Sequence, residues 1–201
     1  MSKTIGDKLL SRLYGKGRGW AFSQADFADL GARSAIDSSL HRLEKAGVIR
    51  RVIRGVYDFP RYSEILGKTI APDIDQVANA LARKFGWRIQ PDGATAQNLL
   101  GLSTQVPARV VYLSDGPKRS YRVGKQSLLF EHTALKEAGF KLPQSRIVVQ
   151  ALKSLGEVRV TPQILSQIRE QLDPACRRKM LLDTKTATGW VHDAIQEIAR
   201  G

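Results

Sequence analysis

The chain has 201 residues, of which 42% are hydrophobic and 25% are charged. These fractions are typical of a packed globular protein and exclude a disordered one, and the length suits one ordinary domain or a small module joined to a medium one. Lysine and arginine number 32 against 19 acidic residues, which gives a net charge of +13. A field of this sign attracts polyanions, and nucleic acid is the commonest such partner.

An anionic membrane is the main competing partner, but it would require a basic amphipathic helix or a lipidation signal. The sequence contains neither, and it has no apolar run of about 18 residues that could span a membrane. The first residues, MSKTIGDKLLSRLYG, are charged throughout and lack the apolar core of a signal peptide. We therefore expect a cytoplasmic protein with no membrane partner.

The first part of the chain contains signals for three helices and a hairpin, separated by glycines and polar turns. The predicted elements are a helix over 4–14, a short strand over 20–22, a helix over 23–31, a helix from Arg33 to Ala46 and a β-hairpin over 47–60, GVIRRVIRGVYDFP. This order of elements is typical of a winged helix-turn-helix. In such a module the last helix before the hairpin lies in the major groove of DNA.

The third helix has two unlike faces. Ile36, Leu40 and Leu43 form one apolar stripe, which predicts the buried side. The opposite face carries Arg33, Ser34, Asp37, Ser38, His41, Arg42 and Lys45. Short hydrogen-bonding groups and cations suit base edges and phosphates. Asp37 would repel phosphate, unless it accepts a hydrogen bond from a cytosine amino group or orients a neighbouring arginine.

The hairpin carries arginines that we expect to contact the phosphate backbone, so that affinity falls as salt rises. The predicted DNA-binding residues are Arg33, Ser34, Ser38, His41, Arg42, Lys45, Arg50, Arg51 and Arg54. Two alternatives stay open. Surface arginines are often merely solvated, and similar hairpins occur in modules that bind proteins.

The rest of the chain predicts an α+β fold. Residues 61–71 form a connector with room for one turn of helix. Further along we expect a helix over 72–86, a strand over 87–89, a short helix over 94–101, strands over 108–116, 118–124 and 127–132, and helices over 144–155, 161–172, 174–182 and 186–199. The predicted domains are thus a DNA-binding module over 1–60 and, after the connector, a second domain over 72–201 with a small antiparallel sheet and a helical C-terminal region.

A basic hairpin in the second domain is a possible further nucleic-acid surface. It carries Lys118, Arg119, Arg122 and Lys125. The run of Arg177, Arg178 and Lys179 is better explained as a solvated helix face.

The sequence offers little for catalysis. His41, His132 and His192 lack metal-ligand spacing. Asp73 and Asp75 resemble the spaced carboxylates that hold magnesium, but acidic residues at a helix start also favour the helix dipole. We therefore predict no enzymatic activity, no metal and no cofactor.

Cys176 is the only cysteine, which excludes an intrachain disulfide and a cysteine-rich zinc site. The neighbouring arginines could lower the pKa of its thiol. Without a recognisable histidine partner, we expect an inert thiol.

Two stretches resemble AbiEi-type antitoxins. LHRLEKAGVIRRVIRGVYDFP, at 40–60, is similar to the end of their winged-helix domain, and GWRIQPDGATAQNLLGLSTQVPARVVYLSDGPKR, at 86–119, is similar to the start of their C-terminal domain. The resemblance implies the antitoxin half of a bacterial type IV toxin–antitoxin (abortive-infection) pair. It also implies a recognition helix from Arg33 to Lys45 and a wing from Arg50 to Tyr57.

What such an antitoxin does also follows from the resemblance. Its winged helix is expected to bind operator DNA and repress its own operon. Its C-terminal domain is expected to oppose a nucleotidyltransferase toxin, by a route that need not involve stable binding. The alternatives are a transcriptional regulator or a protein- or RNA-binding module without a toxin partner, and an enzyme that acts on nucleic acid or nucleotides.

Overall fold

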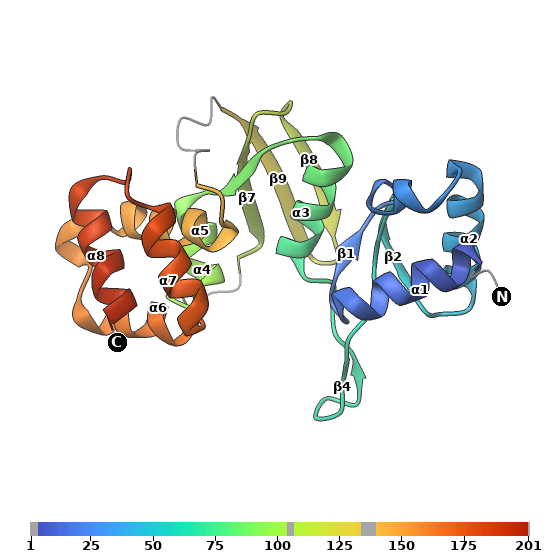
Figure 1. The fold of residues 1–201 in the computed structure, drawn as a ribbon, viewed down its shortest axis with the longest axis horizontal. Helices are drawn as coiled ribbons and strands as arrows, with labels where there is room; N and C mark the ends of the chain where they lie inside the picture. The colour runs from blue at the N-terminus through green and yellow to red at the C-terminus, as the bar shows by residue number, and fades with distance from the viewer. Residues whose placement is uncertain (1–3, 104–106, 134–139, 201) are drawn as a thin grey trace. The chain divides into compact units, whose positions relative to one another are not determined.

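The computed structural model describes residues 4–103, 107–133 and 140–200. Helices and small antiparallel sheets alternate along the chain (Figure 1), so the predicted α+β class is confirmed at this level. The chain divides into two units. Unit 1 comprises Met1–Trp87 and Ser120–Leu128, and unit 2 comprises Arg88–Arg119 and Leu129–Gly201.

Unit 1 begins with helical segments that have well-defined starts. Helix α1 (Ile5–Lys16) is capped by Thr4, whose hydroxyl accepts a hydrogen bond from the backbone of Asp7 while the Asp7 carboxylate accepts one from Thr4. Strand β1 (Ala21–Phe22), the 3₁₀ helix η1 (Gln24–Leu30) and helix α2 (Arg33–Lys45) follow. The predicted second helix is therefore present, but in the tighter 3₁₀ form.

A three-stranded antiparallel sheet completes this part of the fold. Strands β2 (Arg50–Ile53) and β3 (Val56–Asp58) form the predicted hairpin, and β1 pairs with β3 to give the order β1-β3-β2. Gly55 in the turn has φ +73°, a conformation that favours glycine. Arg50 lies opposite Asp58 in the register of the two strands.

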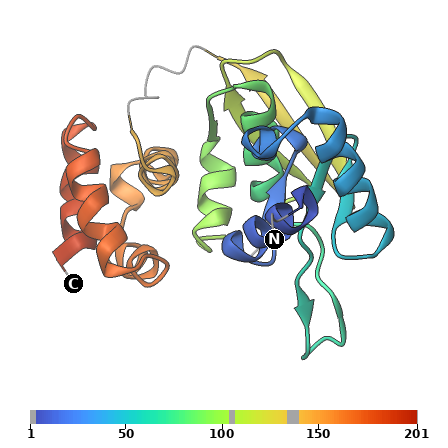
Figure 2. The ribbon, with the colours of Figure 1, turned by 45° about the vertical axis from the view of Figure 1, so that its right-hand side comes forward.

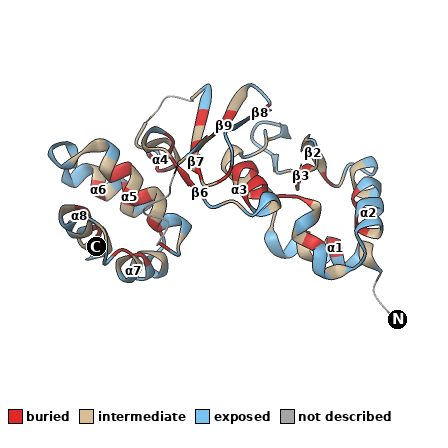
Figure 3. Ribbon diagram, turned by 90° about the horizontal axis from the view of Figure 1, so that it is seen from above, coloured by how far each residue is buried: buried red, intermediate tan, exposed pale blue. Residues whose placement is uncertain are grey.

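The core beneath these elements is one apolar cluster. It consists of Leu9, Leu13, Phe22, Phe27, Ile36, Leu40, Ile49 and Phe59. The stripe predicted on the third helix is confirmed, since Ile36 and Leu40 are buried and Leu43 packs against the cluster. Figure 3 shows buried segments on the sides of α1 and α2 that face this core.

The connector is not a turn of helix, as predicted, but a second hairpin. Strands β4 (Tyr62–Ser63) and β5 (Lys68–Thr69) pair antiparallel, and Gly67, at φ +60°, allows the reversal. In Figures 1 and 2 the hairpin extends away from α1 and α2. Its tip exposes 98% of Ile65 and 61% of Leu66.

Helix α3 (Ile74–Phe85) belongs to unit 1, whereas the sequence-based boundary placed it in the second domain. The reason is a long-range contact at its C-terminal end. The Arg83 guanidinium lies 2.6 Å from the Asp26 carboxylate in η1 and donates to the carbonyl of Ala21 in β1, at 2.8 Å. The local sequence pattern that predicts a helix gives no information about a contact with residues about 60 positions away.

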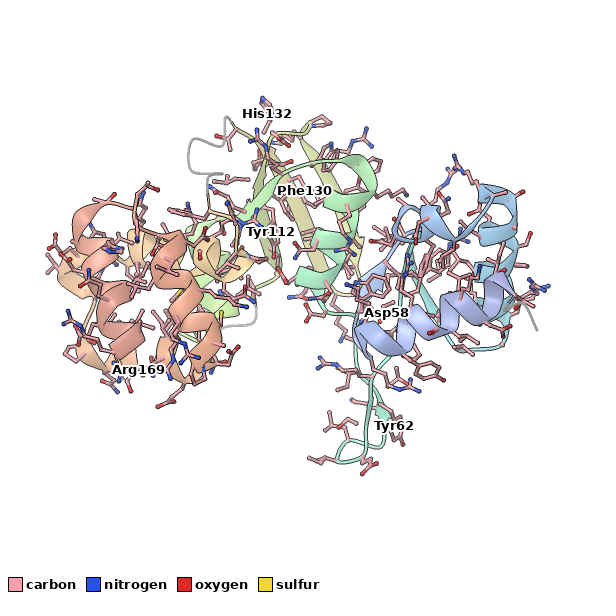
Figure 4. The ribbon with its side chains drawn as sticks, in the orientation of Figure 1. Asp58, Tyr62, Tyr112, Phe130, His132 and Arg169 are labelled. Carbon is pink, nitrogen blue, oxygen red and sulfur yellow. The ribbon has the colours of Figure 1, made fainter. Side chains whose placement is uncertain are left out.

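A four-stranded sheet has the order β6-β7-β9-β8. Its strands are β6 (Ile89–Pro91), β7 (Arg109–Ser114), β8 (Arg119–Val123) and β9 (Gln126–His132). The strand predicted at 87–89 thus lies two residues later. The rings of Tyr112 in β7 and Phe130 in β9 lie 6.1 Å apart between centroids (Figure 4).

The predicted C-terminal helices are confirmed. They are α5 (Pro143–Leu155), α6 (Pro162–Glu170), α7 (Pro174–Asp183) and α8 (Gly189–Arg200), with a 3₁₀ turn η2 (Glu157–Arg159) between the first two. They group together in Figure 2 around a shared apolar core. Helix α4 (Gly93–Leu99), capped by Asp92, contributes Ala96 to the same core.

Gly93 is required where α4 approaches α5. A Cβ added at this position would lie 2.2 Å from Cβ of Ser154, a separation that no packed structure tolerates. Gly93→Ala is therefore expected to lower the free energy of unfolding by about 1–3 kcal/mol, as other overpacked sites do. Urea denaturation measures the effect. The matched control is Gly189→Ala, where an added Cβ meets nothing within 4 Å; equal losses in both variants would contradict the proposed clash.

Candidate nucleic-acid interface

The polar face of α2 is fully presented to solvent. All seven residues predicted to form it are exposed: Arg33, Ser34, Asp37, Ser38, His41, Arg42 and Lys45. Figure 3 shows this side of α2 as exposed. The burial of the apolar stripe fixes the rotation of the helix, so these side chains cannot turn inward without taking Ile36 and Leu40 out of the core.

Hydrogen bonds and ion pairs within α2 orient two of its arginines. Arg33 Nε lies 3.7 Å from Asp37 Oδ2, and the Arg33 side chain is 83% exposed. Asp37 is thus positioned to orient a neighbouring arginine, one of the two roles considered from the sequence. Arg42 Nη2 donates to Ser39 Oγ at 3.1 Å, and Ser39 in turn donates to the carbonyl of Ala35 at 2.9 Å.

The start of α2 is electropositive. Its N-cap residue is Ala32, which makes no side-chain cap hydrogen bond, and the first turn contains no acidic residue. Helices α1, α3 and α4 are instead capped by Thr4, Asp73 and Asp92. The first N–H groups of α2 therefore face outward with the positive end of the helix dipole.

Of the three hairpin arginines, Arg51 and Arg54 are exposed. The Arg51 guanidinium lies over the ring of Tyr57, 5.8 Å from its centroid, which holds the side chain on the surface of the hairpin. Both cations are therefore available to a partner.

Arg50 differs from these two because it is bound within the fold. Its Nε lies 3.0 Å from Oδ1 of Asp58, and Nη2 contacts Oδ2 of Asp58 and the carbonyl of Ile70. Asp58 is only 2% exposed. Arg50 thus neutralises a buried carboxylate. The run of arginines in the sequence could not show this, because the pairing depends on the register of β2 against β3.

A further cation, Lys84 of α3, lies at the hairpin turn. Its Nζ is 3.4 Å from the carbonyl oxygens of both Arg54 and Gly55. Burial lowers the pKa of the Lys84 ammonium, and the charges of Arg54 and Arg33 lower it further. Sequence reasoning missed this residue, since it assigned α3 to a separate domain and no local motif marks the contact.

The second predicted basic surface does not form one group within a single unit. Arg122 and Lys125 belong to unit 1, while Lys118 and Arg119 belong to unit 2. Lys118 pairs with Glu131 at 2.9 Å, and Arg122 Nε donates to the carbonyl of Gly124 at 3.1 Å. Lys118 and Arg122 therefore already have partners within the β8–β9 hairpin.

The residues considered for catalysis either have a structural role or lie where reactivity is disfavoured. Asp73 Oδ1 accepts hydrogen bonds from the backbone of Asp75 and Gln76, at 2.9 and 3.3 Å, and so caps α3. Burial, together with the Asp173 carboxylate, raises the pKa of the Cys176 thiol, which disfavours the nucleophilic thiolate.

The described residues contain neither a cluster of metal ligands nor a membrane-spanning helix. Over residues 4–103, 107–133 and 140–200, no three histidine, cysteine or acidic side chains gather where they could hold a metal ion. In the same residues, no helix combines the length and the apolar character needed to cross a membrane.

The ion pair of Arg50 gives a stability test. Arg50→Ala leaves the buried Asp58 carboxylate without its cation. Breaking such pairs costs several kcal/mol, but the Arg50 side chain is one-third exposed, so we expect a loss of about 2 kcal/mol in unfolding free energy. Arg51→Ala on the same strand is the control and should change stability by less than about 0.5 kcal/mol. Guanidinium titration of both variants measures the two unfolding free energies. Equal stability of the two variants would contradict the structural role of Arg50 and leave it as a candidate DNA contact.

Comparison with known proteins places the chain in a family. The crystal structure of the RV2827C protein from Mycobacterium tuberculosis is distantly similar, with a TM-score of 0.42 and 14% sequence identity over 99% of this chain and 77% of that chain. No curated protein matches. A family model described as a family of unknown function (DUF6088) matches residues 8–180. Because this match covers far more than half of the residues, the chain belongs to the DUF6088 family.

Proposed function

We propose that unit 1 contains a winged helix-turn-helix that binds duplex operator DNA, and that the chain is an autorepressing antitoxin of a type IV toxin–antitoxin pair. The observation that carries the DNA-binding part is the polar face of α2. Its seven residues are all exposed, and Arg51 and Arg54 of the β2–β3 hairpin are exposed as well.

The dimensions and chemistry of α2 suit a recognition helix. Thirteen residues span about 20 Å, and a single helix fits the major groove, which is about 12 Å wide. Ser34, Ser38 and His41 offer hydrogen bonds to base edges, and Arg42 offers a charged donor for guanine. Asp37, 3.7 Å from Arg33, favours orientations of this arginine that keep it beside the carboxylate.

The hairpin and the helix start would bind the backbone. Arg51 and Arg54 supply exposed cations for phosphates, and each phosphate contact releases condensed counterions. The uncapped start of α2 adds N–H groups and a positive dipole end, a combination that favours phosphate. These contacts carry no sequence information but set the register of the helix in the groove.

The antitoxin part of the proposal rests on the resemblance of residues 40–60 and 86–119 to AbiEi-type antitoxins. In this protein the second stretch forms β6, α4 and β7 of unit 2. Residues 105–106 of its QVP motif lie outside the described residues. In this proposal unit 2 counteracts a nucleotidyltransferase toxin, while unit 1 controls expression of the pair.

A binding module for another protein is the second candidate. The β4–β5 hairpin favours it, because Tyr62, Ile65 and Leu66 are all at least 60% exposed. Exposed apolar side chains at the end of a projecting hairpin are suited to a protein contact. A single stoichiometric partner in pull-downs, with no affinity for duplex DNA, would favour this candidate over the first.

DNA binding is tested by fluorescence anisotropy with a duplex from the chain's own promoter and an unrelated duplex. We expect binding to the promoter to weaken steeply as salt rises. The double variant Arg51→Ala/Arg54→Ala should weaken both duplexes alike and reduce the slope of log K against log salt by roughly 1.8, about 0.9 for each lost phosphate. Lys185→Ala, an exposed cation of unit 2, is the matched control.

Sequence preference is tested separately. Arg42→Ala should reduce discrimination between the two duplexes by about 1–3 kcal/mol, because it removes a base contact while the hairpin arginines remain. A variant that loses affinity equally for both duplexes would show that α2 contacts only the backbone. No binding to either duplex by the wild type, even at low salt, would remove the DNA-binding proposal altogether.

A further inference from the structure

Three cations from three different elements gather at the turn of the β2–β3 hairpin. Arg33 comes from the start of α2, Arg54 from the turn itself and Lys84 from the end of α3. The Lys84 ammonium contacts the carbonyls of Arg54 and Gly55, and burial together with the charges of Arg54 and Arg33 lowers its pKa. Among the described residues, neither Arg54 nor Lys84 has a carboxylate within 4.0 Å, and the acidic partner of Arg33, Asp37, lies 3.7 Å away on an exposed face.

The fold holds Lys84 in this place. Its ammonium lies against the carbonyls of Arg54 and Gly55, each at 3.4 Å. An ammonium has three N–H donors, so two weak contacts to carbonyls leave a donor for an outside acceptor. Gly55 makes the approach possible, because a Cβ at that position would lie 2.6 Å from the Lys84 nitrogen.

Repulsion among like charges costs energy in the free protein, and a bound anion would relieve it. Carboxylates of the protein itself relieve it at other places; Asp58 does so for Arg50. Among the described residues, no carboxylate forms an ion pair with Arg54 or Lys84, and Arg33 has only the exposed Asp37 at 3.7 Å. The surplus charge, divided between two planar guanidiniums and one compact ammonium, suits the oxygens of a phosphate group.

We propose that Lys84, with Arg54 and Arg33, binds the backbone phosphates of the DNA duplex. This assignment rests on the proposed function of unit 1. It extends the DNA-binding surface beyond α2 and the β2–β3 hairpin to α3, a helix that follows the β4–β5 hairpin in the sequence. Lys84 then acts as a positional contact that adds affinity for every sequence.

The test is a salt titration of DNA binding by the full-length chain with Lys84→Gln. We expect the slope of log K against log salt to fall by about 0.9, with about tenfold weaker binding near 0.1 M salt, for promoter and unrelated duplexes alike. Lys84→Arg keeps the charge and should retain most of the slope. Lys68→Gln, an exposed lysine of β5 in the same unit, is the matched control and should match the wild type.

Thermal unfolding of the same variants shows whether Lys84→Gln acts through the fold. Removing one of three mutually repelling cations should leave the melting temperature unchanged or slightly higher. A wild type that binds DNA while Lys84→Gln follows an identical salt titration would overturn the role of Lys84 and leave the proposed function standing. A wild type that binds no duplex would overturn both.

Discussion

The packing of α2 on the core of unit 1 is the constraint on which the interface depends. Ile36 and Leu40 enter the apolar cluster shared with α1 and η1, and this fixes the rotation of the helix about its axis. Because helical side chains project around the axis with a period of about 3.6 residues, burying one face fixes which residues lie on the opposite one. The exposed residues of α2 therefore follow from the burial of the apolar ones.

Arginines in this protein divide into those that are paired internally and those that are not. Arg12 forms an ion pair with Asp29 at 2.6 Å, and the hydrogen bond from Arg12 lowers the pKa of the Asp29 carboxyl to about 2. Among the described residues, no carboxylate forms an ion pair of this kind with Arg54 or Lys84. The net charge of +13 thus says less about binding than the positions at which cations lack acidic neighbours.

Local patterns predicted most of the fold and less of the site. Periodic apolar residues located α1, α2, α3 and the C-terminal helices, because burial of one face leaves a period of 3.6 in the sequence. The connector was predicted wrongly, since a hairpin with two-residue strands leaves almost no alternation to detect. The winged-helix assignment and the antitoxin activity stay predictions.

Side-chain roles that depend on distant partners could not be predicted. Arg50 looked equivalent to Arg51 in the sequence, and only the cross-strand register separates a buried ion pair from an exposed cation. Lys84 was overlooked for the same reason, because its neighbours at the hairpin turn are about 30 residues earlier in the chain. Tertiary contacts of this kind leave no trace in composition or spacing.

The apolar cluster of unit 1 has a consequence for synthesis on the ribosome. All of its buried members lie between Leu9 and Phe59, so the whole cluster emerges from the ribosome before the rest of the unit does. Lys84 is added 25 residues after Phe59, roughly one to five seconds later at an elongation rate of about 5–20 residues per second. The last segment of the unit, Ser120–Leu128, follows still later. The nascent chain therefore presents the residues of its helical core first and its full complement of cations only afterwards.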